Sequence, residues 1–359
     1  MSYPQRFWPL SRRLRPKQFL RLADGGRTLF EQALDNIAPL FSPGSILIST
    51  SIYLAERTRA AAPMIPPENI LAEPFKRNTA GCLVFTAAHL LARHGAGEDV
   101  VMAVVAADHT IADTSRYRHV LDTAMTVAEH EDALVTIGIH PDRPETGYGY
   151  IEIGGDRLIT PGVAEDIPVY PVACFREKPD RPTAEKYIAS GRAFWNSGMF
   201  FWRLSRFLRE LETAAPQARR ILDEMAGALA EGNTKKANAA FERLPDISID
   251  YALMERTRRV LVVEADFGWD DVGAWDALDR TLPHDERGNV LVGDPVLVDT
   301  RDSIVYNEPG ADRVAVAVVG VEGLAVIVSG DSVLVIPKDR AQEVRAAVAE
   351  LKKRGAKQV

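Results

Sequence analysis

The sequence predicts an α/β fold with a doubly wound sheet, followed by a second, smaller β-rich domain. Up to Asp108, strand-like and helix-like segments alternate, which is typical of such a sheet. The run 100–107 is continuously apolar, a pattern typical of a parallel strand buried on both faces. Beyond Pro283, short β-forming pieces replace the long helices. We therefore expect one domain over residues 1–282 and another over 283–359.

The first predicted elements lead up to Asp108. Periodicity predicts, in order, helix 29–37, strand 45–50, helix 53–62, strand 70–74, helix 79–93 and strand 100–107. Asn78 or Thr79 is expected to cap helix 79–93, which leaves backbone N–H groups free for an anion or the polar edge of a base. Capping alone explains these two residues equally well.

The elements after Asp108 continue the pattern. They are helix 117–130, strand 133–139, strand 172–175, helix 184–189, helical segments within 204–244 and strand 260–264. Gly147 and Gly149 lie between β-forming residues, which indicates a β-bulge, a close approach of backbone to a ligand, or a simple hairpin. Further on, Val292, Val298 and Ile304 recur at a six-residue interval, a weak β-helix signal. A terminal helix is expected over 339–353.

Composition excludes several classes of function. The chain has 359 residues and a formal net charge of −7, so nucleic acid is not an expected partner. No apolar run approaches the roughly 20 residues of a membrane helix. The two cysteines, Cys82 and Cys174, form no CxxC pair, which fits a reduced, cytoplasmic chain without a zinc site.

Two acidic turns are candidates for a metal site. Asp108 follows the predicted buried strand, at the end where ligands of open α/β sheets bind. A carboxylate there suits Mg²⁺, although by spacing alone capping of the next helix is the simpler explanation. The turn 268–275 supplies further acids, and two acids on separate strand ends suit a metal that clamps a transferring phosphoryl group.

Cations and amides complete the candidate residues. Six cations precede the first acid, Asp24: Arg6, Arg12, Arg13, Arg15, Lys17 and Arg21. Apolar residues interleaved among them favour a structured loop that presents cations to an anion over a solvated tail. Lys178, before Pro179, is either a phosphate ligand or, more simply, an exposed loop lysine. Asn196 and Gly198 interrupt a run of aromatic residues, which suggests hydrogen bonds to a polyhydroxy ligand.

Seven stretches carry a family resemblance. They are residues 6–12 with 16–18, 73–74 with 77–80, 107–109, 146–151, 175–179, 195–200 and 269–273. In this order they resemble the mannose-1-phosphate guanylyltransferases (GDP-mannose pyrophosphorylases) among the sugar-phosphate nucleotidyltransferases. The resemblance implies a Rossmann-like, glycosyltransferase-A-like catalytic domain over 1–282 and a left-handed β-helix-like domain with a terminal helix over 283–359.

The resemblance also implies a reaction, in which GTP and mannose 1-phosphate give GDP-mannose and pyrophosphate by Mg²⁺-assisted in-line attack at the α-phosphorus. Asp108 and Asp271 would hold Mg²⁺. Arg6 and Lys17 would bind the triphosphate and stabilise the leaving pyrophosphate. The implied sugar-phosphate ligand is Lys178, the implied sugar contacts are Gly147, Glu177, Asn196 and Gly198, and the implied nucleotide contacts are Glu73, Asn78 and Thr79. A homodimer is a further candidate assembly.

One departure from the family concerns the first residues. The family begins with a buried strand and a Gly-Gly-x-Gly-x-Arg loop whose N–H groups cradle phosphates. Here residues 1–5 precede Arg6, and Pro4 has no N–H to donate. We expect a start codon assigned too late or a truncated chain. Two alternatives stay open: a catalytically impaired sugar-nucleotide-binding or regulatory protein, and a related nucleotidyltransferase with another sugar or base.

Overall fold

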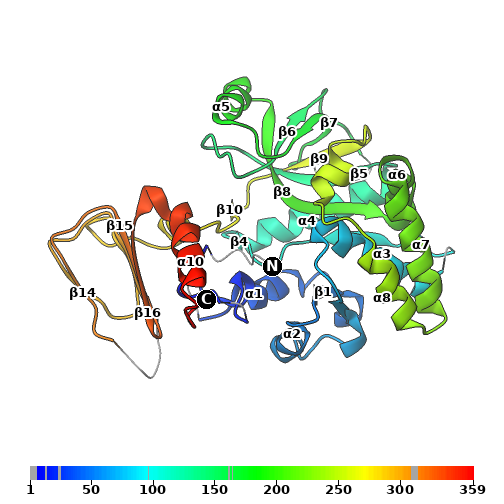
Figure 1. The fold of residues 1–359 in the computed structure, drawn as a ribbon. Helices are drawn as coiled ribbons and strands as arrows, with labels where there is room; N and C mark the ends of the chain where they lie inside the picture. The colour runs from blue at the N-terminus through cyan, green and yellow to red at the C-terminus, as the bar shows by residue number, and fades with distance from the viewer. Residues whose placement is uncertain are drawn as a thin grey trace. The chain divides into compact units, whose positions relative to one another are not determined.

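The computed structural model describes residues 6–12, 14–22, 26–95, 97–160, 162–163, 165–308 and 314–359. The chain forms two compact units, both drawn in Figure 1. The larger unit contains Asn36–Ala106 and Asp113–Gly268, and the smaller unit contains Met1–Asp35, Ala107–Ala112 and Trp269–Val359. The domain boundary expected after residue 282 stays a prediction. The expected absence of the family's first strand and glycine-rich loop concerns residues 1–5, which lie outside the described residues.

A six-stranded sheet with the order β3-β8-β5-β9-β7-β6 lies at the centre of the larger unit, and β6 also pairs with β8. Its strands are β3 (Val101–Val104), β5 (Leu134–Ile139), β6 (Tyr150–Ile153), β7 (Val169–Arg176), β8 (Ala193–Arg203) and β9 (Val260–Ala265). β5 and β9 pair in parallel, and the other described pairings of this sheet are antiparallel. Every residue of β5 is buried, as its apolar sequence predicts.

The strand expected over 100–107 is shorter than predicted and is paired differently. β3 ends at Val104, lies at one end of the strand order and pairs antiparallel with β8. Only Met102 in this strand is fully buried. The prediction of a parallel strand buried on both faces was therefore wrong. An unbroken apolar run indicates that its side chains are buried, but it does not indicate whether the neighbouring strand runs parallel or antiparallel.

Helices and a small second sheet complete the larger unit. The helices are α2 (Ala55–Ala61), α3 (Asn78–His94), α4 (Thr114–His130), α5 (Arg181–Ser190), α6 (Leu204–Ala214), α7 (Pro216–Ala230) and α8 (Thr234–Glu242), with the short turns η2 (Pro43–Ser45), η3 (Pro67–Asn69) and η4 (Asp250–Met254). β1 (Ile48–Ser51) and β2 (Ile70–Glu73) form a separate parallel pair. The core joins α3, α6 and α7 to β8, where the rings of Trp202 and Phe207 stack with centroids 4.9 Å apart. Within the described ranges, no helix has the length and apolar character needed to span a bilayer.

The beginnings of two helices correct the capping predictions. The Asp113 carboxylate accepts the N–H of Arg116 at 2.9 Å and caps α4, so Asp108 has no capping role there. At α3 the N-cap residue is Arg77, which makes no side-chain capping bond. The Thr79 hydroxyl instead accepts the N–H of Ile249 at 2.9 Å. Asn78 adopts a left-handed conformation (φ 55°), and its side-chain oxygen accepts the N–H of Thr79.

The smaller unit contains a β-helix. Its elements are η1 (Lys17–Phe19), the start of α1 (Leu29–Ile37), β4 (Thr110–Ile111), β10 (Trp269–Asp270), η5 (Trp275–Ala277), α9 (Leu278–Thr281), β11 (Val290–Val292), β12 (Val296–Val298), β13 (Ile304–Asn307), β14 (Ala317–Val319), β15 (Leu324–Ser329), β16 (Ser332–Pro337), η6 (Lys338–Glu343) and α10 (Val344–Lys353). β11, β13 and β15 form one parallel sheet, and β12 and β14 form another. β16 then pairs antiparallel with β15. Val290 lies beside Ile304 and Ile304 beside Ala325, so successive coils differ in length, which is why the six-residue signal in the sequence is weak.

One hydrophobic core joins the two ends of the chain within the smaller unit. Phe7, Trp8 and Leu10 share this core with Ile304 of β13 and Val344 of α10. Hydrogen bonds add specificity, because the Trp8 indole donates to the Gln358 carbonyl at 3.0 Å and the Tyr306 hydroxyl donates to the Arg21 carbonyl at 3.1 Å. The N-terminal segment is thus structured, as its interleaved apolar residues predicted.

Candidate active site

The cations of the N-terminal segment have different partners. Arg12 forms an ion pair with Asp331 at 2.5 Å, and Arg15 forms one with Glu308 at 2.6 Å. The loop was predicted to present its cations to an anion. For these two arginines, the anions are side-chain carboxylates of the protein itself, Asp331 and Glu308. Arg13 lies outside the described residues.

Lys17 joins two motifs that are far apart in the sequence. Its Nζ lies 3.0 Å from Asp108 Oδ2 and also donates to the backbone carbonyl of Asp271. Only 16% of the Lys17 side chain is exposed. Arg6 reaches the same turn, since its NH1 donates to the Gly273 carbonyl at 3.5 Å. The structure therefore brings together the four residues that the sequence assigned to the phosphates and the metal.

Neighbouring groups set the charge of this cluster. Burial raises the pKa of Asp108, but the positive charge of Lys17 and its hydrogen bond to the carboxylate outweigh burial, so the pKa lies below its ordinary value. His109 Nδ1 accepts the indole N–H of Trp269 at 3.0 Å. Burial lowers the pKa of His109 more than the Asp108 charge raises it. Near neutral pH the cluster thus contains an ionised Asp108 and an uncharged imidazole.

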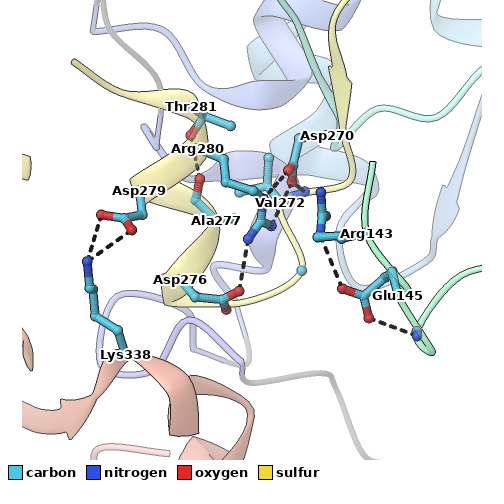
Figure 2. Close-up of polar contacts among 12 residues, drawn as sticks. Arg143, Glu145, Asp270, Val272, Asp276, Ala277, Asp279, Arg280, Thr281 and Lys338 are labelled. Atoms are coloured by element: carbon cyan, nitrogen blue, oxygen red, sulfur yellow. Dashed lines mark hydrogen bonds and ion pairs between the residues drawn. The ribbon is translucent and has the colours of Figure 1, made fainter. Parts of the chain in front are cut away.

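An arginine on α9 holds the turn that carries Asp271, and Figure 2 shows its contact with Asp270 and the contact of Asp270 with Val272. Asp270 Oδ1 accepts the N–H of Val272 at 2.7 Å, and Arg280 Nε donates to Asp270 Oδ2 at 2.7 Å. Arg280 also donates to Asp276 at 3.0 Å. Val272 is fully buried and has φ 46°, an uncommon conformation for a β-branched residue.

The oxygens of this cluster fit a divalent cation that also binds substrate. In the part of the chain that the structure describes, no group of three or more His, Cys, Asp or Glu side chains forms a closed metal site. Mg²⁺ usually takes one or two carboxylates and completes its shell with water and phosphate oxygens. The carboxylates of Asp108 and Asp271 would be such ligands, and the Lys17 ammonium binds Asp108 Oδ2 and the backbone carbonyl of Asp271.

In the larger unit, a second group of predicted residues gathers around β8. The Asn196 side chain donates to Asp250 Oδ1 at 3.1 Å, and its own oxygen accepts the N–H of Gly198 at 3.1 Å. A Cβ on Gly149 would lie 2.5 Å from Glu177 Oε2 and 3.3 Å from Asn196 Cβ. The backbone at Gly149 thus lies close to side chains implied to bind sugar, and the close approach to a ligand stays a prediction.

Acidic groups dominate this second group. Lys178, in a left-handed conformation (φ 47°), forms an ion pair with Glu177, and about half of its side chain is exposed. The Glu177 side chain is 8% exposed, and its backbone N–H donates to Glu255 Oε1 at 2.9 Å. Burial, with the Glu177 charge, raises the pKa of Asp250 to about 6. Hydroxyl groups of a sugar are suitable donors and acceptors for such a set.

The loop before β6 places Gly147 beside a different acid. The N–H of Gly147 donates to Glu145 Oε1 at 2.9 Å, and Glu145 also forms an ion pair with Arg143 at 3.7 Å (Figure 2). The Arg143 guanidinium lies over the Trp195 ring, 4.8 Å from its centre. Gly147 is therefore held by its own loop.

The residues implied to contact the nucleotide lie at the end of β2 and the start of α3. Ser49 donates to Glu73 at 2.8 Å, and burial raises the pKa of Glu73. Asn78 and Thr79 follow a few residues later, and the structure shows their polar atoms engaged with backbone N–H groups. No described contact joins Glu73 to Asn78 or Thr79.

Sequence reasoning missed three residues of these clusters. Asp250 lies in an otherwise apolar stretch, and that isolation was an available signal. Asp270 is adjacent to Asp271, and the resemblance implied a role only for Asp271. Arg280 gave no signal, since an arginine ten residues after an acid has no characteristic spacing.

Comparisons with known proteins agree with this geometry. The family model described as nucleotidyl transferase matches residues 3–287, and the MannoseP isomerase/GMP-like beta-helix domain matches residues 293–351. The mannose-1-phosphate guanylyltransferase of Escherichia coli K12 is 39% identical over 98% of this chain and 72% of its own length. The alginate biosynthesis protein AlgA of Pseudomonas syringae is 36% identical over 98% of this chain and 70% of its own length.

A solved structure extends the likeness to the fold. The protein named mannose-1-phosphate geranyltransferase from Thermus thermophilus superposes with a TM-score of 0.85 at 37% identity, covering 98% of this chain and 97% of that one. The predicted α/β domain followed by a β-helix is thereby confirmed. This chain is a nucleotidyltransferase and belongs to the mannose-1-phosphate guanylyltransferase family.

Proposed function

We propose that this chain transfers GMP from GTP to mannose 1-phosphate and releases pyrophosphate, giving GDP-mannose. Similarity to proteins named mannose-1-phosphate guanylyltransferase, over 97–98% of this chain and 71–72% of their length, supports this pair of substrates. The observation within the chain that carries the proposal is the meeting of three distant motifs at Lys17, whose ammonium pairs with the Asp108 carboxylate and binds the backbone carbonyl of Asp271. Such a cluster suits polyphosphate chemistry.

The reaction needs little proton transfer. An oxygen of the sugar phosphate forms a bond to the α-phosphorus of GTP, and the bond from that phosphorus to the bridging oxygen breaks. Pyrophosphate leaves with the bonding electron pair. Because the second pKa of a phosphate monoester is about 6, the nucleophile is already ionised at neutral pH. The protein therefore contributes positioning and neutralisation of charge.

The smaller unit is proposed to handle the triphosphate. Arg6 and Lys17 bind its oxygens and stabilise the charge of the leaving pyrophosphate. Asp108 and Asp271 are the proposed Mg²⁺ ligands, and the bound ion would supply further positive charge to the phosphates. His109 stays uncharged beside Asp108, so it does not compete with the cations for that carboxylate.

The larger unit is proposed to select the sugar and the base. Lys178, half exposed, binds the sugar phosphate. The proposed contacts to the sugar are Gly147, Glu177, Asn196 and Gly198. Glu73, Asn78 and Thr79 are the proposed nucleotide contacts, with Glu73 at the end of β2 suited to accept hydrogen bonds from a base edge.

The test is pyrophosphate release by the purified chain, given Mg²⁺ and a matrix of GTP, ATP, UTP and dTTP against mannose 1-phosphate and glucose 1-phosphate. We expect release with GTP and mannose 1-phosphate to exceed every other pair by about 100-fold in kcat/KM, because a site built for one set of hydrogen bonds rejects substrates that leave its polar groups unpaired. A preference for UTP or for glucose 1-phosphate would overturn the substrate assignment.

Location and assembly belong to the same proposal. A cytoplasmic location suits the two free cysteines, Cys82 and Cys174, and a supply of GTP. A homodimer stays a prediction, which sedimentation equilibrium of the purified chain would test.

A further inference from the structure

The turn after β10 contains an unusual backbone conformation next to a proposed metal ligand. Val272 adopts φ 46° although its side chain is branched and fully buried. Such a conformation persists only where the surrounding structure imposes it. Asp271 precedes this residue directly, so the orientation of its carboxylate depends on how Val272 is held.

Asp270 holds Val272. Its Oδ1 accepts the Val272 N–H at 2.7 Å, which closes the turn around Asp271 (Figure 2). The Asp270 side chain is only 10% exposed, so its position is sensitive to the loss of a partner.

Arg280 in turn holds Asp270. Its Nε lies 2.7 Å from Asp270 Oδ2 and its NH2 lies 3.4 Å from Oδ1, so the guanidinium binds both oxygens of the carboxylate. NH1 reaches Asp276 at 3.0 Å. Since both Arg280 and Asp276 lie on the short helical segment 275–281, that segment serves as the fixed support of the turn.

We propose that Arg280 is a positioning residue for metal binding: by fixing Asp270, it keeps Val272 left-handed and sets the direction of the Asp271 carboxylate. The proposal rests on the proposed function insofar as Asp271 is a metal ligand. Arg280 itself touches neither metal nor substrate in this role.

Whether substitution of Arg280 raises or lowers the affinity for the cation distinguishes a positioning role from a purely electrostatic one. Arg280 is a positive charge near the proposed cation site. Removing that charge would strengthen cation binding if charge alone mattered. Removing a positioning residue weakens it, and loss of a group that orients a metal ligand commonly costs 10–100-fold in affinity.

The experiment is a titration with Mn²⁺ alone, followed through the electron paramagnetic resonance signal of the free ion. We expect Arg280→Gln to weaken Mn²⁺ binding about tenfold or more and to raise the Mg²⁺ concentration for half-maximal pyrophosphate release by a similar factor. Binding as tight as that of the unsubstituted chain, or tighter, would overturn the proposal. If the unsubstituted chain binds no Mn²⁺, the role of Asp271 as a ligand is refuted and the proposal with it.

Asp276→Asn is the matched control. It removes a carboxylate from the same arginine but leaves the bonds among Arg280, Asp270 and Val272 in place. We expect its Mn²⁺ affinity to stay within about twofold of the unsubstituted chain, and an effect as large as that of Arg280→Gln would refute the assigned path through Asp270.

Arg280→Lys serves if the glutamine variant does not fold, as judged by circular dichroism. Lysine keeps the charge but cannot bind both Asp270 oxygens in a fork. We expect weaker Mn²⁺ binding here too, and unchanged binding would overturn the proposal. A chain that binds Mn²⁺ with this pattern but releases no pyrophosphate from GTP and mannose 1-phosphate would refute the proposed function while leaving the role of Arg280 intact.

Discussion

Asp108 and Asp270 in the smaller unit and Asp250 in the larger unit are held in opposite ways. In the smaller unit, Asp108 faces the Lys17 ammonium and Asp270 faces the Arg280 guanidinium, so each carboxylate has a cation as its partner. In the larger unit, Asp250 receives a hydrogen bond from the uncharged Asn196 and lies in the field of the Glu177 carboxylate. The pKa directions follow, since the pKa of Asp108 is lowered and that of Asp250 is raised.

This difference matches the chemistry proposed for each region. A site for a cation and a triphosphate needs ionised carboxylates to bind the cation and positively charged side chains to bind the phosphates. Carboxylates that are already paired with Lys or Arg side chains provide both before the ligand binds. A site for sugar hydroxyls needs donors and acceptors in fixed positions, and a carboxyl group can serve in either protonation state. The comparison predicts that substitutions in the first region affect turnover most, and that Asp250 in the second region makes stability fall as pH rises.

The largest effect is expected for Asp108→Asn. The substitution keeps the shape of the side chain but removes the charge that attracts Lys17 and the proposed metal. We expect kcat to fall about 100- to 1,000-fold, the usual cost of losing one preorganised electrostatic group. KM for mannose 1-phosphate should change little, because the proposed sugar contacts lie in the larger unit. The measurement is initial-rate pyrophosphate release at saturating GTP.

A control keeps this result interpretable. Far-ultraviolet circular dichroism and the unfolding midpoint in urea should stay close to those of the unsubstituted chain. Retention of full Mg²⁺-dependent turnover by the folded variant would break the comparison, since Asp108 would then not act on the charged substrates at all.

The ionisation of Asp250 is expected to have a smaller effect, which is on the stability of the fold. Its pKa of about 6 in the folded chain lies above the value of about 3.9 in an unfolded chain. Between these two values the folded state retains a proton that the unfolded state has lost. The contribution of Asp250 to the free energy of unfolding is therefore present at low pH. It decreases by up to about 3 kcal/mol as pH rises from about 4 to about 6.

Asp250→Asn isolates that contribution. We expect the variant to gain stability over the unsubstituted chain as pH rises from 4.5 to 7.5, because asparagine cannot ionise. Urea unfolding of both chains at each pH gives the difference in free energy of unfolding. A difference that does not change with pH would show that Asp250 is not held in its protonated form, and the contrast with Asp108 would then lose its basis.

In the smaller unit, the family resemblance singled out Lys17, Asp108 and Asp271, which the structure brings together, but it did not indicate how the charges there pair. The motifs were recognisable through their order along the chain. Nothing in the sequence indicated that Arg12 and Arg15 pair with Asp331 and Glu308, because a partner some three hundred residues away leaves no periodic signal.

The same limit explains the errors in local structure. The apolar run that contains β3 could not reveal that its neighbour β8 runs antiparallel, since that neighbour comes from a segment about one hundred residues later. Asn78 and Thr79 have the composition of helix caps, but the hydroxyl of Thr79 is taken by the N–H of Ile249, a tertiary contact that overrides the local preference.

The smallest effect is expected for the ion pair of Arg15 and Glu308. Its atoms lie 2.6 Å apart, but 33% of one side chain and 22% of the other are exposed, so water screens the attraction. A double-mutant cycle with Arg15→Gln and Glu308→Gln should give a coupling free energy below about 1 kcal/mol in urea unfolding. Turnover should fall no more than about threefold, because the buried Phe7 and Leu10 still fix the segment. A much larger loss of turnover, with stability intact, would mean that Arg15 takes part in binding phosphate, and the cations of the loop would then act together with Lys17.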